Sequence, residues 1–146
     1  MTGVPRGNPT GRLRMREDAL VDLPHESLYA TELVGDCMEP LFTAGCRVVG
    51  TSSRHPINGE YVLVFLHGVE TPLLKRAVMI PPPMMMSIKP GGNVTVLVIV
   101  EQINPTRTYQ FPVDRIESIH PVIAVAPAGS DVAVPVAEFI GDIVAA

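Results

Sequence analysis

The chain has 146 residues, 47% of them hydrophobic, with two cysteines and a net charge of −4. This length predicts a single domain with its own core, the two cysteines exclude a disulfide framework, and no apolar run is long enough to span a membrane. Because the one cluster of arginines precedes residue 18 and the rest of the chain has an acidic excess, the body is not expected to bind nucleic acid directly.

Residues 1–27 are expected to form a flexible N-terminal arm, because they begin with a stretch rich in Gly and Pro. The arm lacks the apolar segment of a secretory signal, so we expect a cytoplasmic protein. From residue 28 the pattern changes to short runs rich in Val, Ile and Tyr, separated by turn residues, which is typical of strands. The segments predicted as strands are 28–34, 46–50, 60–67, 72–80, 93–100 and 122–126.

Residues 28–126 are therefore predicted to form one compact, mainly β domain with short helical turns. Fifteen prolines argue against long helices, and the helical turn expected inside the domain lies at 40–44. The stretch 80–88, rich in Met and Pro, is interpreted as an irregular loop that leads into a strand. The apolar C-terminal tail, 127–146, is expected to form a short helix or strand, packed either on the body or on a partner.

Two residues carry the candidate chemistry. Cys37 lies in "VGDCMEP", after a predicted strand and before a turn, where backbone N–H groups can face an incoming carbonyl. Lys75 lies in the apolar run "TPLLKRAV", where loss of hydration favours the neutral amine that can act as a general base. A nucleophile with a lysine base is a variant of the nucleophile–base pair. Residue types alone favour a structural role instead, with an inert core thiol and a lysine that extends to solvent.

Neither a metal nor a cofactor is expected. The four histidines are scattered along the chain, and no Cys/His spacing fits a zinc site. Cys37 and Cys46 lie nine residues apart. A redox pair formed by these two cysteines is a third hypothesis, and it requires the two sulfurs to meet within disulfide reach.

The segment 32–78 resembles the peptidase domain of the LexA, UmuD and phage-repressor family, which shares its β fold with bacterial signal peptidase. The motif of that family is Gly-Asp-Ser-Met-x-Pro, followed by turns that contain glycine and by a strand that bears Lys-Arg. The positions that match are Gly35, Asp36, Met38, Pro40, Gly45, Gly59, Glu60, Lys75 and Arg76. Because 114–126 also resembles the closing strand of the family, the resemblance covers about residues 28–126.

The resemblance implies that Cys37 takes the nucleophile position and Lys75 the base position, with the N–H of Cys37 helping to hold the oxyanion. The residues that it places around the cleft are Gly35, Asp36, Met38 and Pro40. It also implies a homodimer formed through β edges, and a cleft that takes an extended peptide segment, from the protein's own arm or from a partner protein. Such domains regulate transcription in the SOS response to DNA damage and in phage repression.

Departures from the family pattern leave two functions open. Cys37 replaces the nucleophilic serine, and a thiolate nucleophile requires a charged Lys75, whereas the serine mechanism requires a neutral one. Cys46 replaces an acidic turn residue, and the arm lacks the Ala-Gly or Cys-Gly bond that self-cleaving members cut. The first function is a dimeric regulatory domain that cleaves a peptide bond through a Cys-Lys pair. The alternative is a catalytically inactive peptide- or protein-binding module that regulates a repressor or a DNA-repair partner.

Overall fold

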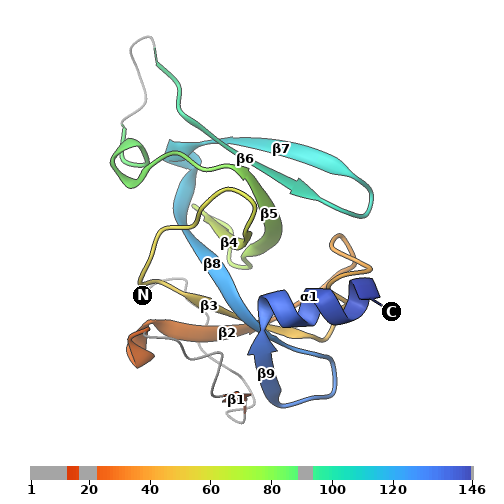
Figure 1. Cartoon of the computed structure of the whole chain (residues 1–146). Helices are drawn as coiled ribbons and strands as arrows, with labels where there is room; N and C mark the ends of the chain where they lie inside the picture. Colours follow the sequence, from red (N-terminus) through yellow and green to blue (C-terminus); the bar gives the residue numbers. More distant parts are fainter. Residues whose placement is uncertain (1–12, 17–22, 89–93, 146) are drawn as a thin grey trace.

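The computed structural model of the chain describes residues 13–16, 23–88 and 94–145, with side chains up to residue 141. The fold is mainly β, as predicted (Figure 1). The elements are β1 (Arg14–Met15), η2 (His25–Ser27), β2 (Leu28–Glu32), β3 (Arg47–Thr51), β4 (Tyr61–Leu66), β5 (Leu73–Met79), η3 (Pro83–Met85), β6 (Leu97–Gln102), β7 (Arg107–Pro112), η4 (Val113–Arg115), β8 (Ile116–Ala126), β9 (Val132–Pro135) and α1 (Val136–Ala145). None of the helices in these ranges has both the length and the apolar character that a membrane span requires.

The long strand β8 joins two groups of strands. Its first half pairs antiparallel with β4, and the sheet continues through β5 and β6 to β7. Its second half lies between β3 and β9, both antiparallel to it, and β2 pairs with the outer side of β3. Figure 1 shows β8 running from the region of the β6–β7 hairpin toward β3, β9 and α1. The turn that follows β2 is hydrogen-bonded to the connection between β6 and β7, so it links the second group of strands to the first.

Each of the six predicted strand segments overlaps a strand, although the bounds differ by several residues at 93–100 and 122–126. The strand β7 was missed, because it lies at an edge of the sheet, where half of its side chains are exposed and none is fully buried, so it lacks a run of apolar residues. The predicted helical turn at 40–44 is a turn closed by a hydrogen bond from Phe42 N to the Met38 carbonyl at 3.0 Å.

The C-terminal segment packs on the body of the protein. Phe139 of α1 is 9% exposed and joins the largest apolar cluster, which lies around Phe42 and Met38. The rings of Phe42 and Phe139 are stacked with their centroids 5.6 Å apart, and Phe42 meets Tyr61 edge-to-face at 4.9 Å. Of the two positions expected for this segment, on the body or on a partner, the structure thus has the first.

Part of the N-terminal arm is attached to the same segment. The strand β1 pairs parallel with β9, and Arg14 N donates to the Asp131 carbonyl at 2.7 Å. The guanidinium of Arg16 makes a two-pronged ion pair with Glu138 of α1, in which Nη1 and Oε2 lie 2.7 Å apart. The remainder of the arm before Leu23 lies outside the described residues.

Three rings meet where β2, β4 and β8 come together. The Tyr29 hydroxyl and Nδ1 of His120 share a hydrogen bond of 2.5 Å, and Phe65 contacts both rings. Burial lowers the pKa of His120 from its ordinary value of 6.5, and burial raises the pKa of Tyr29. Gly50 leaves room for this cluster, because a Cβ at that position would come within 2.9 Å of the Tyr29 ring.

Because burial lowers the pKa of His120, we expect the protein to lose stability in mild acid. The folded protein keeps this imidazole unprotonated at a pH where the unfolded chain binds a proton, so the free energy of unfolding falls as the pH drops below 6.5. The free energy of unfolding is measured by urea titration at several pH values between about pH 5 and pH 8. It is expected to change less steeply with pH in His120→Gln than in wild type. The substitution His67→Gln, at an exposed position, is the matched control, and an unchanged slope in His120→Gln would contradict the prediction.

Candidate functional site

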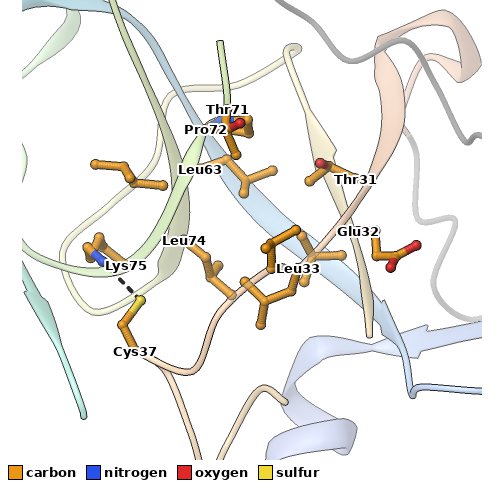
Figure 2. Close-up of a pocket in the computed structure, with 12 residues that line it drawn as sticks. Thr31, Glu32, Leu33, Cys37, Leu63, Thr71, Pro72, Leu74 and Lys75 are labelled. Atoms are coloured by element: carbon orange, nitrogen blue, oxygen red, sulfur yellow. Dashed lines mark hydrogen bonds between the residues drawn. The ribbon is translucent and has the colours of Figure 1, made fainter. Parts of the chain in front are cut away.

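The turn after β2 brings Cys37 to the side chain of Lys75. Lys75 Nζ donates a hydrogen bond to Cys37 Sγ at 3.3 Å (Figure 2). The lysine is 4% exposed and the cysteine is half-buried. The two residues that the sequence singled out for chemistry, 38 positions apart in the chain, therefore lie in contact.

The strand β5 determines which basic side chain reaches the cysteine. Neighbouring residues of a strand point to opposite faces, so Lys75 and Arg76 diverge. Lys75 pairs with Val62 of β4 and lies on the same side of the strand as the buried Ala77. Arg76 points the other way, where it forms a partly exposed ion pair with Glu101. Lys75 is therefore kept inside the protein, and it does not extend to solvent.

The connection between β6 and β7 fixes the position of the cysteine. The N–H groups of Ile103 and Asn104 both donate to the Cys37 carbonyl, at 3.1 and 2.8 Å. The side-chain amide of Asn104 donates to the Asp36 carbonyl at 3.2 Å. Three hydrogen bonds thus hold two consecutive carbonyls of the turn. In the described part of the chain, no hydrogen bond has the Cys37 N–H as its donor, so this group is available to bind an oxyanion.

The same connection also holds the lysine, through residues that the sequence analysis missed. Gln102 Oε1 accepts from Lys75 Nζ at 3.2 Å and from the Tyr109 hydroxyl at 2.9 Å. Gln102 Nε2 donates to the Pro105 carbonyl at 3.0 Å. In addition, Lys75 Nζ lies 5.4 Å from the centroid of the Tyr109 ring, within cation–π range.

A signal for Gln102 was present in the sequence. Val98, Val100 and Gln102 alternate along β6 and are all buried. A glutamine that continues the buried face of a strand must find hydrogen-bond partners inside the protein. Because Gln102 follows Val98 and Val100 at every second position, the sequence indicates that its side chain points into the protein. The sequence does not reveal which group that side chain binds.

Four residues were predicted to shape the cleft. Gly35 has φ +93°, a conformation that favours glycine, and Met38 is fully buried in the core. Asp36 and Pro40 are exposed, and the Asp36 carbonyl accepts from Glu39 N at 3.1 Å. These residues build and anchor the turn that carries the cysteine, and they do not line the cavity beside it.

A cavity of about 110 Å³ opens next to the Cys–Lys pair (Figure 2). One wall is formed by 31–34, which end β2 and follow it, and another by 71–75, which lead into β5; Val48 and Leu63 complete the lining. The strand β5 pairs with β6 only from Arg76 onward, so in the described residues the stretch from Leu73 to Lys75 has a strand partner on one side only. An extended peptide can pair with that free side.

The remaining thiol belongs to the core. Cys46 is fully buried, and burial raises its pKa to about 11. Both cysteines are free, and a thiol that stays protonated at neutral pH is a poor nucleophile and a poor redox partner. Among residues 13–16, 23–88 and 94–145, no three His, Cys, Asp or Glu side chains gather to hold a metal ion.

No protein-family model, curated protein or solved structure with which the chain was compared matches it. Fold and site by themselves define a mainly β domain with a Cys–Lys pair beside a mostly apolar cavity. Any function must therefore be argued from the chemistry of that pair and from the shape of the cavity.

Proposed function

We propose that this chain is a LexA/UmuD-like regulatory domain whose Cys37–Lys75 pair cleaves a peptide bond. The observation that carries the proposal is the 3.3 Å contact between Lys75 Nζ and Cys37 Sγ, made by a lysine that is only 4% exposed. Burying a lysine is costly, and such groups concentrate at sites where a reaction uses them. The match to the family motif at 35–40 and at Lys75 supports the same function.

In the proposed reaction, Cys37 Sγ attacks the carbonyl carbon of the scissile bond and Lys75 handles the proton. The free N–H of Cys37 binds the oxyanion. The substrate is an extended segment of the protein's own arm or of a partner protein, which lies along the free side of Leu73–Lys75 and fills the cavity with an apolar side chain. We expect the domain to act as a homodimer.

One observation favours the alternative of a binding module that does not cleave. The two Ala-Gly bonds of the chain lie at Gly45 and Gly129, and both glycines are in turns with positive φ, +93° and +85°. A peptide bond in a tight turn cannot lie extended across a nucleophile. The cavity would then hold a segment of a repressor or of a DNA-repair partner by strand pairing alone.

The test of cleavage combines two incubations, each followed by mass spectrometry. The purified protein is kept at neutral and at alkaline pH to detect self-cleavage, and it is mixed with a library of unstructured peptides to detect cleavage in trans. We expect wild type to produce new termini, and Cys37→Ala and Lys75→Met to do so at least about a hundredfold more slowly.

The control is Arg76→Met, which removes a positive charge from the adjacent position of the same strand without touching the cysteine. It is expected to cleave like wild type. If no form cleaves any peptide, the peptidase function is wrong and the binding module becomes the function to pursue, by identifying which library peptides the protein retains.

A further inference from the structure

We infer that Cys37 and Lys75 rest as a thiolate–ammonium pair and that Gln102 is the positioning residue that holds the ammonium against the sulfur. The inference deepens the proposed function, because it assigns the proton and a positioning residue to the same pair. It rests on that function only for the reaction steps, since the resting state itself requires no peptide. The orientation of the Gln102 amide is the starting point.

That orientation is determined by three contacts. If the amide were rotated by half a turn, its oxygen would face the Pro105 carbonyl, which now accepts from Nε2 at 3.0 Å. Two acceptors at that distance repel each other, so the rotated form is excluded. Gln102 Oε1 therefore faces Lys75 Nζ at 3.2 Å, and the lysine must donate to it. The Tyr109 hydroxyl, which donates to the same oxygen at 2.9 Å, fixes the amide further.

The surroundings of Lys75 fit an ammonium group. One N–H points to Gln102 Oε1 and one to Cys37 Sγ, while the face of the Tyr109 ring attracts the positive charge. In the described residues no carboxylate forms an ion pair with this lysine. A buried ammonium needs an anionic partner, and the sulfur is the group in contact that can supply one.

The proton is expected on nitrogen for a chemical reason. An ordinary thiol is a stronger acid than an ordinary alkylammonium, by about two pH units, so the sulfur gives up its proton before the nitrogen does. Burial opposes the separated charges, whereas their direct contact and the acceptor from Gln102 favour them. With serine in place of cysteine, the hydroxyl would be far too weak an acid for this transfer.

The pair also allows a balanced reaction. The thiolate forms a C–S bond with the scissile carbonyl carbon, the C–N bond breaks, and the leaving nitrogen takes a proton from the Lys75 ammonium. The lysine, now neutral, removes a proton from water, and the hydroxide attacks the thioester. The C–S bond then breaks, which restores the thiolate and the ammonium and releases the acid. Gln102 accepts from the lysine throughout and touches neither the substrate nor the sulfur.

The test measures the reactivity of Cys37 and uses no peptide. Wild type and variants are treated with iodoacetamide over a range of pH, and the rate of carbamidomethylation at Cys37 is read by mass spectrometry. We expect Gln102→Met to alkylate about tenfold more slowly at pH 7, because a hydrogen bond to a charged group is lost, and its rate–pH profile to move to higher pH.

Gln110→Met makes the same chemical change at an exposed position of the same hairpin and serves as the control for folding and for side-chain loss. Tyr109→Phe keeps the ring and removes the hydroxyl that fixes the amide, and it is expected to give an intermediate rate. The inference is overturned if Gln102→Met, with an unchanged melting temperature, alkylates at the wild-type rate and with the wild-type profile. Slow alkylation in wild type, no faster than in Lys75→Met, overturns it as well.

Failure of this inference and failure of the proposed function are distinguishable. Fast, Gln102-dependent alkylation without cleavage of any peptide would leave a reactive thiolate in a protein that is not a peptidase. Cleavage without dependence of alkylation on Gln102 would leave a peptidase whose cysteine is activated only during the reaction. The first outcome rejects the peptidase function and keeps the thiolate–ammonium pair, and the second rejects the pair and keeps the peptidase function.

Discussion

Replacing Cys37 by serine is expected to lower peptide cleavage by at least about a hundredfold, although serine is the nucleophile of the family that the sequence resembles. A serine hydroxyl must lose its proton to a neutral lysine during the attack. The thiolate–ammonium pair inferred above, with Gln102 Oε1 and the Tyr109 ring beside the lysine, does not supply that neutral lysine. Oxygen also forms a shorter bond than sulfur, which displaces the acyl carbon from the Cys37 N–H.

The measurement is the peptide-library assay, with wild type, Cys37→Ser and Cys37→Ala compared at equal concentration. Cys37→Ser is expected to fall near Cys37→Ala. If Cys37→Ser cleaves faster than wild type, the natural cysteine has silenced a serine-type site, and the lysine is available as a neutral base. That result would contradict the thiolate–ammonium pair directly, whereas loss of cleavage in both variants would support it.

The sequence predicted strands that bury aliphatic side chains and missed β1 and β7, in which no side chain is fully buried. β4 and β5 are rich in Val and Leu and were located within a residue at each end, because burial on both faces leaves an apolar run. Half of the side chains of β7 are exposed and none is fully buried, because the strand lies at a sheet edge. Its position depends on pairing with β6, which is a tertiary contact and leaves no local pattern.

The sequence singled out Cys37 and Lys75, which lie in contact, and not the residues that hold them. Cys37 and Lys75 stand out because a cysteine in a turn and a lysine in an apolar strand are each unusual. Gln102 and Asn104 act through single hydrogen bonds across the fold, to the lysine and to the turn carbonyls. Such hydrogen bonds depend on where the β6–β7 hairpin lies in space, and the spacing of residues along the chain does not specify that position.

Replacing Phe42 by alanine is expected to lower the free energy of unfolding by about 3–5 kcal/mol. Its ring is fully buried between Tyr61 of β4 and Phe139 of α1, and its N–H closes the turn 38–42 that directly follows Cys37. The loss of the ring leaves a cavity that β4 cannot fill without distorting the sheet. Ile57→Ala, at a residue that is 64% exposed, is the control and is expected to change stability by less than about 0.5 kcal/mol.

A double-mutant cycle then tests whether α1 is docked through these rings. Phe42 and Phe139 are stacked at 5.6 Å, so the combined loss in Phe42→Ala/Phe139→Ala should be smaller than the sum of the single losses by about 0.5–1.5 kcal/mol. Urea denaturation of the four proteins gives this coupling energy. Strict additivity would mean that α1 does not pack on Phe42 in solution. Because the N–H of Phe42 closes the turn that directly follows Cys37, the same variants should also alkylate Cys37 differently from wild type, which would link the C-terminal helix to the site.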